Sequence, residues 1–171
     1  MISNIQETST YKEQLITRTW IQTDSLEGMS PITQVYAICF NEKHEILVCR
    51  EDSNKPWILP GGHPENNESV EETLIRELQE ETDVLVKNIK ILGAQRVDNP
   101  DNPNKNEGNR FYQVRIVCKL EKLLPQTIDP ASGIIWERKF VPADKITEFV
   151  KWGLIGERMF ADALGKLEQS S

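Results

Sequence analysis

Three glutamates in one short segment have the residue type and spacing that divalent metal chemistry requires. Glu80 and Glu81 follow Glu77 by three and four residues, so on a helix the three carboxylates share a face within an arc of about 100°. Residues 68–83 include seven acidic residues and one basic residue, Arg76. Like charges at this spacing repel, and a hard dication with oxygen ligands removes that cost. The segment therefore predicts a site for Mg²⁺, with Mn²⁺ as an alternative.

An acidic helix face can also be plain solvated surface, and most glutamate clusters are. Here Leu74, Ile75 and Leu78 occupy the neighbouring arc of the same helix and are expected to face the core. The carboxylates then lie at the border between core and solvent, where a cleft would form. Because the usual lysine partners at i,i+4 are also missing, we favour the metal site.

The segment that begins at Gly62 and ends at Val84 resembles the Nudix box. Gly62 is followed after five residues by Glu68, and after seven more by Arg-Glu-Leu-Gln-Glu-Glu-Thr-Asp-Val. Every defined position of the box agrees except its last glycine, which is Asp83 here. That glycine ends the helix in a left-handed conformation, which aspartate tolerates at modest cost. Similar sequence around the box, from Trp-Ile-Leu-Pro-Gly-Gly to Phe-Val-Pro, extends the resemblance over about residues 33–150.

The resemblance assigns roles to the residues of the box. It implies that the metal is held by Glu77, Glu80 and Glu81 and by the carbonyl of Gly61. Arg76 resembles the arginine that holds a catalytic glutamate by an ion pair, a task that suits a guanidinium. The catalytic set implied is thus Glu77, Glu81 and Arg76, and the general base remains open among Glu77, Glu81 and a loop carboxylate. The first box glutamate, Glu68, is expected to act in structure or in the outer shell of the metal.

The reaction implied is metal-dependent hydrolysis of a nucleoside diphosphate linked to another group, X. The metal polarises a phosphoryl oxygen and lowers the pKa of bound water, and a carboxylate takes the proton. Nucleoside triphosphates, ADP-ribose, nucleotide sugars and dinucleoside polyphosphates all remain open as substrates. A Nudix-fold module that binds a nucleotide without cleaving it is the alternative, which loss of box glutamates would favour; all of them are present.

Four residues outside the box are weaker candidates for substrate binding. Arg50 ends a predicted strand just before the glycine pair, where it could meet a phosphate or a base. Trp57 could stack on a nucleobase, although buried aromatic residues are commoner. Glu107 lies in a polar loop that could supply a carboxylate, and Glu137 precedes Phe-Val-Pro, where many family members have another site glutamate. Ordinary surface or core positions are the competing interpretation for all four.

The elements expected to position these residues alternate between strands and helices. Strands are predicted at 33–40 and 45–50, joined by a turn, then briefly at 57–59, and at 84–97, 111–120 and 134–141. Helices are predicted at 69–82, where Ser69 and Glu72 form a capping-box pattern, and at 142–150 and 152–167. Residues 98–109 form a loop. This order predicts an α/β/α sandwich of the Nudix type around a central mixed β-sheet.

Composition limits the partners and the domain organisation. The formal net charge of −7 argues against long nucleic acid, including an RNA 5′ end, but is compatible with a nucleotide-type small molecule. No apolar run is long enough for a membrane span, and residues 1–10 are unlike a signal peptide. Cys39, Cys49 and Cys118 lie in strand-like apolar runs, which predicts reduced core thiols and a cytoplasmic location. We expect an extension at 1–30, with an edge strand or loose chain and a possible homodimer contact, a Nudix domain at 31–167 and a polar tail at 168–171.

Overall fold

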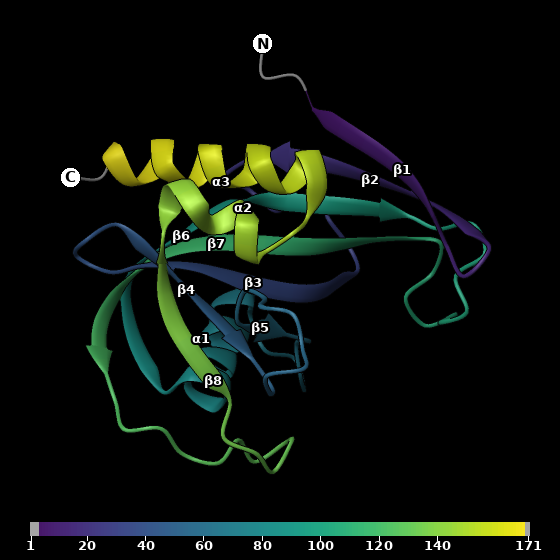
Figure 1. The fold of residues 1–171 in the computed structure, drawn as a ribbon. Coiled ribbons are helices and arrows are strands. Elements are labelled where there is room, and N and C mark those ends of the chain that lie inside the picture. Colours follow the sequence, from purple (N-terminus) through teal and green to yellow (C-terminus); the bar gives the residue numbers. More distant parts are fainter. Residues whose placement is uncertain (1–3, 170–171) are drawn as a thin grey trace.

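Eight strands form one mixed sheet in the computed structural model, which describes residues 4–169 (Figure 1). The strands are β1 (Ile5–Tyr11), β2 (Gln14–Gln22), β3 (Ile32–Phe40), β4 (Glu45–Arg50), β5 (Gly61–Gly62), β6 (Val84–Asp98), β7 (Arg110–Leu123) and β8 (Glu137–Pro142). Their spatial order is β1-β2-β6-β7-β3-β4-β8, and β5 pairs with β3. Within the described residues β3 and β7 run parallel, whereas the other pairs are antiparallel. The predicted mixed sheet is confirmed.

Helices cover both faces of this sheet (Figure 1). Helix α1 (Val70–Thr82) lies on one face, and α2 (Ile146–Phe149) and α3 (Gly153–Glu168) lie on the other. Alternate residues of β3 supply the two cores, because successive side chains of a strand point to opposite faces. Val35 and Cys39 pack on the α1 side, and Ile38 and Phe40 pack on the α3 side. The α/β/α sandwich is therefore as predicted, and all three cysteines are buried free thiols.

The N-terminal residues form a hairpin that extends the sheet. Strand β1 pairs with β2, and β2 pairs antiparallel with β6, with Trp20 opposite Gln95. Trp20 is buried, and its indole N–H donates to Asp162 of α3 at 2.8 Å. This anchor holds the hairpin to the body of the protein, and β1 is an edge strand, which is one of the two alternatives that the sequence leaves open for residues 1–30. The predicted polar tail overlaps the end of α3, and its last two residues, 170–171, lie outside the described part of the chain.

Helix α1 begins as its sequence predicts, and two of its three predicted core residues are buried. The Ser69 hydroxyl accepts from the Glu72 N–H, and the Glu72 carboxylate accepts from the Ser69 N–H, which completes the capping box. Leu74 and Leu78 are fully buried against the sheet. The expectation for Ile75 is wrong, since its side chain is exposed. The face in contact with the sheet is therefore narrower than the apolar pattern suggests.

Three predicted elements differ in extent from the observed ones. At 57–59 only Ile58 makes a bridge, with Cys49, and the strand pairing falls after Pro60 at the two glycines of β5. Strand β8 begins at Glu137 rather than at 134. The helix predicted at 142–150 is a 3₁₀ turn (Ala143–Lys145) followed by the four-residue α2, and neither start has a side-chain cap. Every helix in the described residues is too short or too polar to cross a bilayer.

Candidate active site

Two adjacent glycines allow helix α1 to approach the sheet closely. Gly61 has a φ of 151°, and a Cβ there would collide with the backbone of Val35 and Tyr36 on β3. A Cβ on Gly62 would collide with the Glu77 carboxylate. Because glycine has no Cβ, the short strand β5 fits between β3 and the carboxylates of α1. This packing brings the acidic face of the helix to the sheet.

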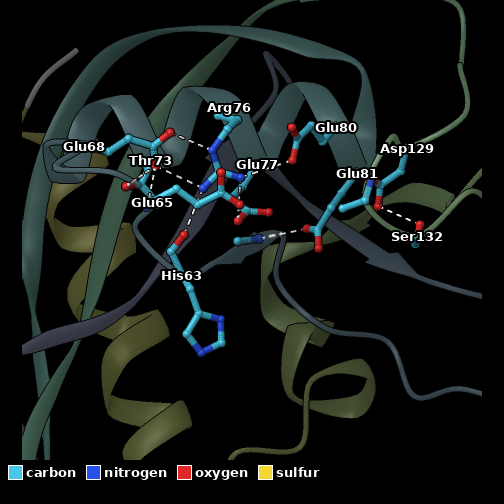
Figure 2. Close-up of polar contacts among 12 residues, drawn as sticks. His63, Glu65, Glu68, Thr73, Arg76, Glu77, Glu80, Glu81, Asp129 and Ser132 are labelled. Carbon is cyan, nitrogen blue, oxygen red and sulfur yellow. Dashed lines mark hydrogen bonds and ion pairs between the residues drawn. The ribbon is translucent and has the colours of Figure 1, made fainter. Parts of the chain in front are cut away.

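Glu81 is the most buried carboxylate of the cluster. Its side chain projects toward β5 (Figure 2), only 7% of the residue is exposed, and one oxygen accepts from the Gly61 N–H at 2.9 Å. Burial, followed by the charges of Glu77 and Asp129, raises the pKa of Glu81 to about 8. Within residues 4–169 the Glu81 carboxylate has no ion pair with a lysine or arginine. It is therefore an uncompensated acidic group at the edge of the core.

Arg76 holds the other two carboxylates of the predicted metal site. Its Nη1 donates to Glu77 at 2.9 Å and to Glu80 at 3.1 Å, as Figure 2 shows. Glu77 is half-buried, and burial raises its pKa although Arg76 opposes the shift. The expectation that the cluster lacks a cationic partner is thus wrong for Glu77 and Glu80. It holds for Glu81.

Glu68 fixes the position of Arg76. Its carboxylate accepts from Nε of Arg76 at 2.7 Å and from Nη2 at 3.0 Å, while the same Nη2 also donates to the His63 carbonyl at 2.9 Å. Glu68 further accepts from the Thr73 hydroxyl and the Glu65 N–H. The hydrogen bonds from Arg76 and Glu65 lower the pKa of Glu68 to about 2. This arrangement fits the structural role that the box resemblance implies.

A loop far along the chain brings a further carboxylate to the site. Residues 124–136 connect β7 to β8, and Asp129 from this loop lines a cleft of about 360 Å³ together with Glu77, Glu80 and Glu81. The Asp129 carboxylate accepts from the Ala131 N–H at 2.8 Å, the Ser132 hydroxyl at 2.7 Å and the Trp136 indole N–H at 2.9 Å. Sequence reasoning missed Asp129, because nothing in its spacing connects it to the box.

Asp83, which replaces the box glycine, anchors this loop. It adopts the left-handed conformation expected of the missing glycine, with φ 48° and ψ 47°. Its carboxylate accepts from the Thr127 N–H at 2.8 Å and from the Thr127 hydroxyl at 2.6 Å. Arg138 donates to the carbonyls of Thr82, Asp83 and Leu124 and ties the same corner together. The departure from the box thus creates a link between the end of α1 and the loop that carries Asp129.

Substitution of Asp83 by glycine is expected to free the loop rather than disrupt the helix. The variant loses two hydrogen bonds to a charged acceptor, about 1.5–3 kcal/mol each, and regains about 1 kcal/mol from the relaxed left-handed backbone. We expect a net loss of unfolding free energy of about 2–5 kcal/mol and faster hydrogen exchange at the Thr127 amide. Thr127→Val, which removes only the hydroxyl bond, should show a smaller loss. Unchanged exchange at residue 127 in Asp83→Gly would contradict the anchoring role.

The oxygen-rich cleft suits a hard divalent cation. Its potential ligands are the carboxylates of Glu77, Glu80, Glu81 and Asp129 and the carbonyl of Gly61. In the described part of the chain, no three acidic, histidine or cysteine side chains converge on one ready-made ion position. Mg²⁺ often takes only one or two carboxylates and completes its shell with water and substrate phosphate. The residues therefore fit a metal that is bound together with a phosphate group.

The weaker candidates from the sequence lie away from this cleft. Arg50 forms an ion pair with Glu137 at 2.6 Å, and its guanidinium lies 4.3 Å from the centre of the Trp57 ring. These three residues thus form a cluster of their own, with Arg50 at the end of β4, Glu137 at the start of β8 and Trp57 in the loop before β5. Glu107 is in the 98–109 loop, where it accepts from Asn102 at 3.4 Å. None of the four is among the residues that line the carboxylate cleft.

Comparison with known proteins places this site in a family. The NUDIX domain model matches residues 31–161, which include β3, the glycine strand, α1 and the loop with Asp129. The match spans well over half of the chain. The protein therefore belongs to the Nudix family, and the β1–β2 hairpin precedes the matched residues.

Solved structures show the same fold at low sequence identity. The Bacillus subtilis pyrophosphohydrolase BsRppH is 20% identical, with a TM-score of 0.65, over 99% of this chain and 98% of that one. A NUDIX hydrolase from Nitrosomonas europaea is 18% identical, with a TM-score of 0.58, over 80% and 90%. A MutT protein from Methanosarcina mazei is 26% identical, with a TM-score of 0.51, over 83% and 98%.

Proposed function

We propose that the protein hydrolyses the phosphoric anhydride bond of a nucleoside diphosphate linked to another group. One observation carries this proposal: Glu81 is a buried carboxylate without a cationic partner in the described residues, and it lines a cleft with Glu77, Glu80 and Asp129. A solvated acidic face would not place a carboxylate in this environment, because burial of an unpaired charge is costly. A divalent cation with a bound phosphate would compensate that charge.

In the proposed reaction the residues of the box serve metal binding, orientation of a ligand and proton transfer, and Glu81 is proposed both to bind the metal and to accept the proton. Glu77, Glu80 and Glu81, with the Gly61 carbonyl, would hold Mg²⁺ or Mn²⁺, which polarises the phosphoryl oxygen and lowers the pKa of bound water. Arg76 orients Glu77 through its hydrogen bond. Glu81 is our first choice for the group that accepts the proton from water, because its carboxylate lines the cleft and has no lysine or arginine partner in the described residues. Asp129 is the loop carboxylate that competes for this role.

A nucleotide-binding module without hydrolysis is the second candidate. It is favoured by the ion pairs of Arg76 with Glu77 and Glu80, which occupy two of the predicted ligands. In this case the protein would bind a nucleotide, and added metal would not displace Arg76 from the carboxylates. The two candidates differ in whether added Mg²⁺ leads to bond cleavage.

A substrate panel with identification of both products tests the proposed function. The panel contains nucleoside triphosphates, ADP-ribose, a nucleotide sugar, a dinucleoside polyphosphate and a short 5′-triphosphorylated RNA. We expect cleavage of a pyrophosphate linkage in a nucleotide-type small molecule with Mg²⁺ and none with excess EDTA, and the two products locate the broken bond. Nucleotide binding without turnover in Mg²⁺ or Mn²⁺ would support the module instead.

A further inference from the structure

A second cavity lies between the N-terminal hairpin, the sheet and the first turn of α3. Its volume is about 510 Å³, larger than the carboxylate cleft. Strands β1, β2, β3, β6 and β7 supply its walls. The polar lining includes Arg18, Gln34, Gln95 and Arg115. The start of α3 lies close to β1 on this side of the sheet (Figure 1). No residue of the box lines this cavity.

Arg115 is a buried cation without an acidic partner in this cavity. Only 2% of the residue is exposed, and among residues 4–169 its Nε has no hydrogen-bond partner. Its Nη1 donates to the Val114 carbonyl at 3.3 Å. The guanidinium carbon lies 4.6 Å from the centre of the Tyr36 ring and 4.9 Å from that of the Trp152 ring. Burial lowers the pKa of Arg115 to about 10, so the side chain still carries a charge at neutral pH.

The surroundings of Arg115 are positive although the protein as a whole is acidic. Arg18 and Lys151 also line the cavity, and Glu7 is its acidic residue. The Glu7 carboxylate is already used, because it accepts from two backbone N–H groups in the first turn of α3 at 3.1 and 3.2 Å. The formal net charge of the chain is −7. A local excess of positive charge in such a chain indicates a site for an anion.

Tyr36 lies between the cavity and the carboxylate cleft. Its side chain lines the cavity and contacts Arg115, while its backbone pairs with Gly61 in the sheet. Gly61 in turn lines the carboxylate cleft and donates to Glu81. A molecule whose pyrophosphate lies at the cleft could therefore extend into the cavity on the other side of this residue.

We propose that the cavity binds an oxyanion, a phosphate or a carboxylate, on the part of the substrate remote from the cleaved bond, with Arg115 as the residue that selects it. The inference rests on the proposed function and narrows the substrate to a nucleotide with a second anionic group. The aromatic rings hold the guanidinium in place, and its unpartnered Nε–H is a donor to an oxygen of the ligand. Two-donor recognition of an oxyanion is the task for which a guanidinium is suited. The glutamine amides offer further donors beside it.

Direct binding tests the cavity without any need for hydrolysis. Inorganic phosphate and acetate are titrated by calorimetry in EDTA, at ionic strength held constant with NaCl, on a Glu81→Gln background that removes the buried carboxylate of the cleft. We expect saturable binding of at least one anion and a loss of about tenfold or more in affinity in Arg115→Met. Arg110→Met, which removes an exposed arginine outside the cavity, should bind as the parent does. Parallel titrations with phosphate and with acetate distinguish a phosphate group from a carboxylate group as the preferred ligand.

Kinetics on the best substrate of the panel give a second readout. Arg115→Met should raise KM about tenfold or more and leave kcat within about twofold, because Arg115 does not touch the carboxylate cleft. Replacement of an unpaired buried cation by an apolar residue should keep the protein folded; if it does not, Arg115→Gln serves in its place. Equal anion affinity in parent and variant, or no binding above the NaCl control, overturns the proposal. Absence of turnover with intact anion binding would refute the proposed function alone.

Discussion

Glu81→Gln is expected to lower kcat/KM with Mg²⁺ by about 10²–10⁴-fold and yet leave the metal-free protein as stable as the wild type, or more stable. The substitution removes the negative charge that a metal requires and keeps an oxygen that can accept from the Gly61 N–H. It also removes a carboxylate whose ionisation is disfavoured by burial. Activity and stability should therefore change in opposite directions, which a variant that merely misfolds would not show.

The stability of the metal-free protein in EDTA is expected to depend on pH through Glu81. The pKa of Glu81 is raised from an ordinary value of 4.5 to about 8 in the folded protein. The folded state therefore binds the proton more tightly than the unfolded state, and stability falls as pH rises between about 4.5 and 8. Glu81→Gln should flatten this fall, and Mg²⁺ should oppose it in the wild type.

Thermal unfolding from pH 5 to 8 and steady-state kinetics measure the two halves of the prediction. Glu71→Gln is the matched control, because Glu71 lies exposed in the first turn of the same helix. It should change neither activity nor the pH slope. Full activity of Glu81→Gln would remove Glu81 from the proposed metal site, and an unchanged slope would show that its carboxyl is not the buried acid.

Arg76→Lys should lower kcat/KM about 10–100-fold although it preserves the charge. Arg76 donates to Glu68, Glu77 and Glu80, with two bonds to Glu68, and also to a backbone carbonyl. A lysine ammonium is a single compact donor group and cannot reach these acceptors together. Loss of residues that orient metal ligands has effects of this size.

The reduced activity of Arg76→Lys should be accompanied by a higher Mg²⁺ requirement. Activity is measured over a Mg²⁺ titration, and Arg158→Lys is the control, since Arg158 forms an i,i+4 pair on α3. The control should be indistinguishable from the wild type. If Arg76→Lys reached wild-type kcat/KM at the same Mg²⁺ concentration, the ion pairs of Arg76 would have no part in positioning the carboxylates.

The parts of the site that depend on local sequence could be predicted. The capping pair of Ser69 and Glu72 fixes the start of α1, and helical periodicity places Leu74 and Leu78 in the core. The same periodicity puts the carboxylates of Glu77 and Glu81 along the border of the helix. These relations involve residues at most four positions apart, so a single helix determines them.

The parts of the site that depend on packing between distant segments could not be predicted from the sequence. Asp129 reaches the cleft because Asp83 binds Thr127, a contact across 44 positions of the chain. The pairing of Arg50 with Glu137 follows from the register between β4 and β8, which neither strand reveals alone. Arg115 lies within the strand predicted at 111–120, and its burial depends on Tyr36 of β3 and Trp152 before α3, which pack against it. The surroundings of these residues are determined by contacts between distant segments, which composition and local patterns do not reveal.

The cavity and the carboxylate cleft are built from different parts of the sequence, because the β1–β2 hairpin contributes only to the cavity. It contributes Glu7 and Arg18 to the cavity, whereas the Nudix match begins at residue 31 and contains every carboxylate of the cleft. The other lining residues, Arg115 among them, lie within the match, so the cavity is built by the hairpin and the matched residues together. For protein engineering, the hairpin residues that line the cavity, such as Arg18, are positions at which preference could be retuned while the carboxylates of the cleft stay unchanged.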